Sequence, residues 1–264
     1  MTANPSGTAH RVARHPAIAK LAKIGFASRG VIYVLMGVFA LGIAFQSSSK
    51  KADKSGAIHT VAETPFGSVL LWVMAIGLTA LVIWQVADAI VGTDTKDRVE
   101  AVARSVVYTL LVISILGLLL AGKDAASTDS QSKDVTAKLL ELPAGQILVF
   151  AVALILAVVG VVWIVEGWTE KFMKDMHVTS PRAVRPVTNL GKAGYIARGV
   201  IAIVAGVFIG KAAIDYDPKE AVGIDGALRA LTEAPAGRWL LAVVALGLIL
   251  FAGYCVAEAR WHRT

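Results

Sequence analysis

The chain alternates between long apolar runs and short polar stretches. Six apolar runs fall at about residues 24–45, 67–91, 102–122, 145–167, 194–214 and 237–258. A helix crosses the hydrocarbon core of a bilayer in roughly 20 residues, so each run is long enough to span it. The sequence shows none of the polar and apolar alternation of transmembrane strands, which argues against a β-barrel. The pattern predicts an all-α integral membrane protein with six transmembrane helices.

A short polar motif, Glu-x-Pro-x-Gly, precedes every second apolar run. It occurs as Glu63, Pro65 and Gly67, as Glu141, Pro143 and Gly145, and as Glu233, Pro235 and Gly237. The residues before each copy have apolar positions spaced by three and four, which predicts a short helix lying on the membrane surface. Because proline ends one helix and starts the next, the motif predicts the beginning of the following span.

The other three apolar runs carry an arginine near their start. The stretches read GFASRGVIY, EAVARSVVY and GYIARGVIA, and place Arg29, Arg104 and Arg198 in equivalent positions. The first run is longer than the roughly 7–15 apolar residues of a signal peptide and has a close copy downstream, so we expect a retained helix.

Each even-numbered run also ends with an acidic residue. Counting 21 residues from the motif glycines reaches Asp88, Glu166 and Glu258. At about 1.5 Å per residue this spacing is close to the hydrocarbon thickness, which puts the acids at the depth of the arginines. We therefore expect a ring of Arg–carboxylate pairs, formed either within or between repeats.

Three copies of the same features divide the chain into repeats. The predicted organisation is a basic cytoplasmic tail (1–20), helix-pair repeats 1 and 2 (21–95 and 96–170), a cytoplasmic interfacial linker (171–189) and helix-pair repeat 3 (190–264). Repeats with two spans each all point the same way, so the expected bundle has pseudo-threefold symmetry about the membrane normal.

Composition and charge add a topology. The chain is 56% hydrophobic and 17% charged, with a net charge of +7. The side that holds both termini carries 16 Lys/Arg against 8 Asp/Glu, and the opposite side 10 against 11. An excess of Lys and Arg marks the cytoplasmic face. We therefore expect both termini in the cytoplasm and contacts with anionic lipid headgroups rather than with nucleic acid.

The repeated G-(Y/F)-x-x-R-G opening, the helix pairs and the three tandem copies resemble the domain of unknown function 1206 family. The resemblance covers residues from about 20 to 260 and implies a bacterial plasma-membrane protein built of three two-helix units. It implies no activity, substrate or catalytic residue.

The predicted charged groups have two interpretations each. The Arg–acid ring is either a structural clasp, with arginines that reach toward headgroups, or an inner gate around a central cavity. The motif glutamates either cap the helices that follow or form an outer cation-binding ring.

The sequence offers little other chemistry. Its single cysteine, Cys255, excludes an intramolecular disulfide. No histidine lies within a predicted span and no His/Cys cluster has zinc spacing, so we expect neither haem nor a metal. We also expect no enzymatic activity, because no nucleophile–base set is identifiable. The leading hypothesis is an accessory or scaffold partner of another membrane protein, and the alternative is a small-solute or ion transporter gated by the ring.

Overall fold

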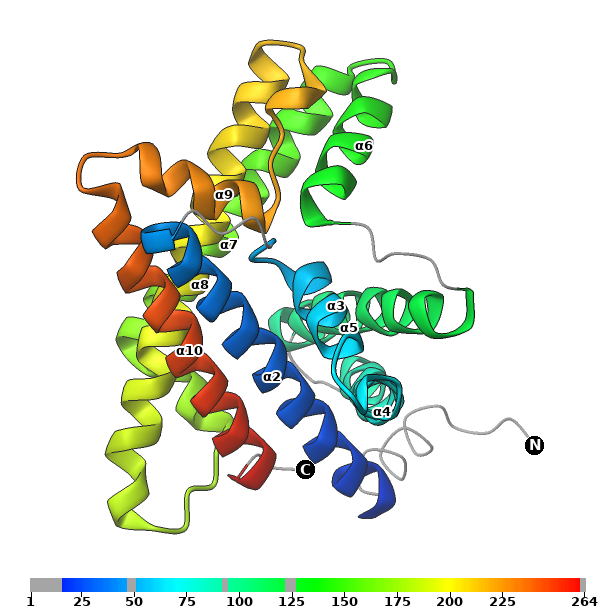
Figure 1. Ribbon diagram of the computed structural model, residues 1–264, viewed down its shortest axis with the longest axis vertical. Coiled ribbons are helices and arrows are strands. Elements are labelled where there is room, and N and C mark those ends of the chain that lie inside the picture. The colour runs from blue at the N-terminus through cyan, green and yellow to red at the C-terminus, as the bar shows by residue number, and fades with distance from the viewer. Residues whose placement is uncertain (1–15, 47–50, 92–94, 122–126, 262–264) are drawn as a thin grey trace.

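The computed structural model describes residues 16–46, 51–91, 95–121 and 127–261, and these are almost entirely helical (Figure 1). Six of the helices are long and apolar enough to cross a membrane, which confirms that prediction. They are α2 (Pro16–Gln46), α4 (Gly67–Val91), α5 (Thr95–Ala121), α7 (Gly145–Thr169), α8 (Pro181–Ile214) and α10 (Gly237–Trp261).

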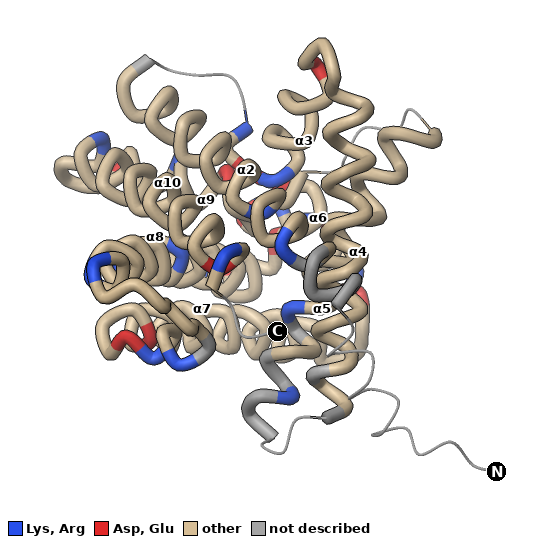
Figure 2. Tube along the Cα trace, turned by 90° about the horizontal axis from the view of Figure 1, so that it is seen from below, with Lys and Arg blue, Asp and Glu red and all other residues tan. Residues whose placement is uncertain are grey.

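Three shorter helices occupy the connections that follow α2, α5 and α8. These connecting helices are α3 (Lys54–Ala62), α6 (Thr128–Leu140) and α9 (Ile224–Ala230). Short 3₁₀ turns complete the connections as η1 (Lys171–Asp175), η2 (Pro218–Glu220) and η3 (Leu231–Glu233). In Figure 2 several charged residues lie near the middle of the view and others lie at helix ends.

The long helices pack as a series in which each contacts the next. The order is α7, α8, α10, α2, α4 and α5, while α5 and α7 form no comparable pair within the described part of the chain. In Figure 1, α2 and α10 lie side by side, whereas α4 is seen almost end-on, so the long helices are not parallel to one another. The two long helices of the middle repeat therefore pack against helices of the other repeats rather than against each other.

Glycines allow the closest approaches between helices of different repeats. A Cβ on Gly199 of α8 would collide with the backbone of Gly160 on α7. A Cβ on Gly37 of α2 would come within 2.8 Å of the carbonyl oxygen of Ala245 on α10. Small residues permit this backbone approach in membranes.

The segment after α7 differs from the predicted interfacial linker. Helix α8 begins at Pro181 rather than near residue 194, so the second part of the predicted 171–189 linker is helical. Hydropathy misplaced this start because the first turns of α8 are polar, although proline at the first helical position favours a helix. Phe172 in η1 is buried and stacks on Tyr195 with ring centroids 5.0 Å apart. This part of the linker thus packs onto the bundle.

Candidate functional site

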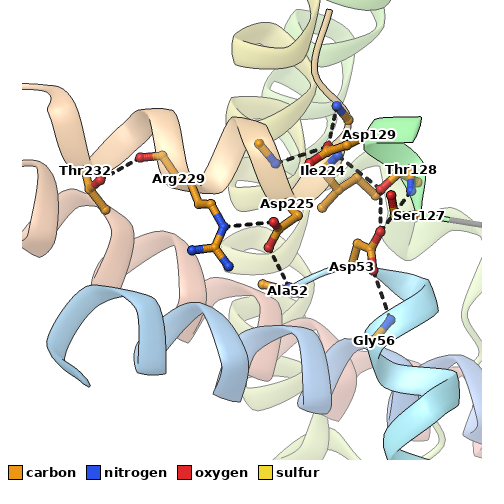
Figure 3. Close-up of polar contacts among 12 residues, drawn as sticks. Ala52, Asp53, Gly56, Ser127, Thr128, Asp129, Ile224, Asp225, Arg229 and Thr232 are labelled. Carbon is orange, nitrogen blue, oxygen red and sulfur yellow. Dashed lines mark hydrogen bonds and ion pairs between the residues drawn. The ribbon is translucent and has the colours of Figure 1, made fainter. Parts of the chain in front are cut away.

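The amino-terminal ends of the three connecting helices meet at one place, where each contributes an aspartate (Figure 3). The residues are Asp53, Asp129 and Asp225, which we call the aspartate ring. Asp53 is fully buried and Asp225 is 6% exposed. A carboxylate at a helix start accepts hydrogen bonds from unpaired N–H groups and lies at the positive end of the helix dipole.

Asp53 joins the first repeat to the second. It is the N-cap of α3 and accepts a hydrogen bond from the N–H of Gly56 at 3.0 Å. Its other carboxylate oxygen accepts from both the N–H and the hydroxyl of Thr128, each at 2.9 Å, at the start of α6. Burial alone would raise the pKa of Asp53, but these hydrogen bonds outweigh it and hold the pKa below its ordinary value. The carboxylate is thus kept ionised.

The other two aspartates continue the same direction around the chain. Asp129 accepts from the N–H of Gly223 at 2.6 Å and of Gly226 at 3.2 Å, in the third repeat. Asp225 accepts from the N–H of Ala52, in the first repeat, at 2.7 Å. Each repeat therefore holds the next through a carboxylate, and the third returns to the first.

The aspartate ring does not appear in an alignment of the repeats, because the connecting helices differ in length. They contain 9, 13 and 7 residues, so the aspartates fall at different distances from the Glu-x-Pro-x-Gly motif. A fixed shift between repeats therefore does not align them. An N-cap search could have found Asp53 and, through Ser127, the start of α6, but α9 follows Gly223 and gives no such signal.

A second group of charges lies on the long helices, where Arg29 of α2 forms an ion pair with Glu258 of α10. Its guanidinium also donates to the hydroxyl of Tyr108 at 2.6 Å and to the Sγ of Cys255 at 3.2 Å. The side chains of Arg29 and Glu258 are 13% and 9% exposed, so the arginine does not reach out toward headgroups. This pair joins the first repeat to the third, whereas the sequence left pairing within or between repeats open.

Arg198 of α8 lies among aromatic rings instead. Its guanidinium carbon is 4.1 Å from the ring centroid of Trp163 and 4.7 Å from that of Phe251. The rings of Tyr33 and Tyr195 are each 5.7 Å away. A cation over an aromatic face is stabilised by the ring quadrupole. Within the described residues, Arg198 has no carboxylate partner.

The three repeated arginines lie around one side chain. Arg29, Arg104 and Arg198 are all close enough to interact electrostatically with the phenol of Tyr195, as is Glu258. The ring of Phe251 lies between two of the cations, 5.4 Å from the guanidinium of Arg29 and 4.7 Å from that of Arg198. We call this group the arginine centre.

The structure says less about the other members of the predicted ring, which are Arg104, Glu166 and Asp88. Arg104 and Glu166 are half-buried, and each makes polar or charged contacts. The side chain of Asp88 lies outside the described residues. The structure thus brings Arg29 and Glu258 together, and it surrounds Arg198 with rings where the sequence predicted an acid.

The Glu-x-Pro-x-Gly motif forms a tight turn between each connecting helix and the next span. The N–H groups of Gly67, Gly145 and Gly237 each donate a 2.8 Å hydrogen bond to the carbonyl three residues earlier. A Cβ on Gly67 or Gly145 would collide with the backbone of α3 or α6, and a Cβ on Gly237 would collide with the backbone of η3. The residue before the glycine is left-handed in two copies, with φ of 61° at Ala144 and 57° at Ala236.

The motif glutamates lie at the ends of the segments that precede the turns. Glu63 and Glu141 are the C-caps of α3 and α6, and all three motif glutamates are exposed. The N-cap of α7 is Ala144, without a side-chain cap, so the predicted capping by Glu141 is wrong. Each motif glutamate ends the segment that precedes the turn, so it lies before the proline. The N-cap of the next helix lies after the proline. Among the described residues, no group of three His, Cys, Asp or Glu is placed to hold a metal ion.

Comparisons with known proteins agree with the repeat structure. The sequence matches the family described as Domain of Unknown Function (DUF1206) over residues 24–92, 99–170 and 193–262. The uncharacterized protein YxxB of Bacillus subtilis (strain 168) is 31% identical over 257 residues, which cover 94% of this chain and 92% of that protein. No solved structure matches the chain. The triple match confirms the resemblance seen in the sequence motifs, and the chain belongs to the DUF1206 family.

Proposed function

We propose that this protein is a non-enzymatic accessory or scaffold protein of an assembly in the bacterial plasma membrane. The excess of Lys and Arg on the side of the termini supports an orientation with both termini in the cytoplasm. Lys192 lies 4.7 Å from the ring centroid of Trp168, which is 70% exposed. Exposed Trp and Lys at a span end are typical of the membrane interface, which supports contacts with anionic headgroups there.

We further propose that the three repeats surround a pseudo-threefold axis along the membrane normal. Two kinds of contact support this arrangement. The aspartate ring joins repeat 1 to 2, repeat 2 to 3 and repeat 3 to 1. In addition, the first long helix of each repeat packs on the second long helix of another, as α2 on α10, α5 on α4 and α8 on α7.

The observation that carries the scaffold function is the open middle repeat. Spans α5 and α7 are the least enclosed of the six. Only 22% and 17% of their most apolar stretches are buried, compared with 61% for α10. Their exposed side chains include bulky residues such as Ile113 and Leu154. A partner helix that packs against α5 and α7 would bury such side chains. Lipid alone would cover them without specificity.

The transporter alternative has support from the buried charges of the arginine centre. The core beside them, however, is packed with apolar side chains, including Ile32, Met36 and Leu78, each at most 1% exposed. A transport pathway needs a polar, water-filled route through such a core. Tight packing favours a static clasp and thus the scaffold function.

Site-specific photocrosslinking in intact cells tests the proposal. A photoreactive residue at Ile113 or Leu154 should give a discrete crosslinked product with another protein. Val243, on α10, is 67% exposed and serves as the matched lipid-facing control. Protein products that appear equally at all three positions, or at none, would contradict a docking face on the middle repeat.

A further inference from the structure

Lys54 is the first residue of helix α3. It is half-buried and lies within electrostatic range of Arg198 and Arg29. Among the described residues it has neither a hydrogen-bond acceptor nor an ion-pair partner. Asp53 is its nearest acid, but both oxygens of that carboxylate already accept hydrogen bonds from Gly56 and Thr128. Lys54 therefore carries a partly buried charge that no described residue pairs directly, and a ligand of opposite charge would reduce the cost of that burial.

Lys54 also lines a pocket between α3, α5 and α6. The pocket has a volume of about 120 Å³, and its polar lining consists of Lys54, Ser55, Ser114, Thr128 and Gln131. Lys54 is the one charged residue among those that line it. The hydroxyl of Ser114 makes no hydrogen bond to any described residue, so it can donate to a ligand. The opposite wall is apolar and comes from α3 and α5.

We propose that this pocket binds a small oxyanion, a carboxylate or phosphate group, on the ammonium of Lys54 and the hydroxyl of Ser114. Tyr108, which accepts a hydrogen bond from Arg29, is on the same helix, α5, as the pocket-lining residues Val107 and Leu111. The positive potential of Arg29 and Arg198 extends to the pocket and favours a negative ligand over a neutral one.

The protonation of Lys54 supports an anion over a cation. Burial and the charges of Arg198 and Arg29 lower the pKa of Lys54 to about 8, although the charge of Asp53 acts in the opposite direction. The group is therefore still mostly charged at neutral pH. A bound oxyanion would favour the charged form of Lys54 against the repulsion from Arg198 and Arg29, and so would be held more tightly below pH 8 than above it.

The same chemistry has two sources, a phosphate or carboxylate in solution and the headgroup of an anionic lipid. The first arm of the test uses full-length protein in phosphate-free detergent, titrated with sodium phosphate or sodium acetate at constant ionic strength. The second arm uses nanodiscs of phosphatidylcholine with or without phosphatidylglycerol. In each arm the midpoint of thermal unfolding is measured for the wild type, Lys54→Gln and Lys51→Gln, the last being an exposed neighbour.

A ligand that binds only the folded state raises the midpoint of thermal unfolding of the protein, here by about 5 °C near saturation. We expect this rise for the wild type and Lys51→Gln, and none for Lys54→Gln. A rise with the free salts identifies a solution anion, and a rise with phosphatidylglycerol alone identifies a headgroup. An equal rise in Lys54→Gln, or no rise in either arm, would overturn the site. Lys54→Arg, which keeps the charge, should retain the rise and covers the case in which Lys54→Gln does not fold.

This site does not depend on the scaffold function. Loss of the photocrosslinks on α5 and α7 would leave the midpoint shifts unchanged, and absence of the shifts would leave the crosslinks unchanged.

Discussion

The buried ion pair between Arg29 and Glu258 makes a sharp prediction for Glu258→Gln. The change keeps the shape of the side chain but removes its charge, and Arg29 is left buried without its carboxylate. Breaking a buried pair by removal of one partner costs about 3–5 kcal/mol. Arg29 retains the hydroxyl of Tyr108 and the ring of Phe251, so we expect the lower end of this range.

Thermal unfolding in detergent measures this loss. For a chain of this size each kcal/mol lowers the midpoint by about 2–4 °C, so Glu258→Gln should unfold about 10 °C below the wild type. Glu220→Gln is the matched control, because its ion pair with Lys211 is exposed and its removal should change little. The double variant Arg29→Met with Glu258→Gln should recover much of the loss, since no charge then stays buried alone. A midpoint for Glu258→Gln within about 2 °C of the wild type would refute the clasp, as would a double variant no more stable than the single.

Three further predictions concern the connecting helices. Because the pKa of Lys54 is about 8 in the folded chain and 10.5 in the unfolded chain, the unfolded state binds more protons between these values and stability rises with pH across them, by about 3 kcal/mol in total. Unfolding midpoints measured from pH 7 to 10 should show this rise in the wild type and lack it in Lys54→Gln. Gly145→Ala should cost about 1–3 kcal/mol by the same assay, because its methyl group collides with the end of α6, whereas Gly117→Ala, which meets nothing within 4 Å, should be neutral or stabilising. Asp225→Ala leaves the buried N–H of Ala52 without its acceptor, which should cost about 1–3 kcal/mol and speed hydrogen exchange at that amide; unchanged exchange there would count against the aspartate ring.

The sequence predicted the long helices well and their partners poorly. Apolar runs of more than about 20 residues identify spans, because the bilayer fixes their length. The start of α8 was misplaced because hydropathy does not report polar helical turns before a span. The turn glycines were found because they recur in the sequence. The reason that glycine is needed there, close contact with the preceding helical segment, is visible only in the folded structure.

The candidate site was only half accessible to such reasoning. The spacing that put Glu258 at the depth of Arg29 is a one-dimensional property, and the structure joins these two residues. The spacing along the sequence could not predict that Trp163 and Phe251 lie against Arg198. Which side chains meet depends on which helices pack together. The aspartate ring was hidden by the unequal lengths of the connecting helices, and it needs three-dimensional contacts to be seen.

The aspartate ring also sets an order on the synthesis of the protein. Asp225 follows Ala52 by 173 residues, which a ribosome makes in about 10–35 s at about 5–20 residues per second. During that interval the first two repeats have emerged, and the amide of Ala52 has no acceptor from the third. The last link therefore closes only after the third repeat has been inserted, and a chain that stalls after the second repeat stays open at this junction. Quality-control proteases in the membrane would meet such a chain with its unfinished junction exposed.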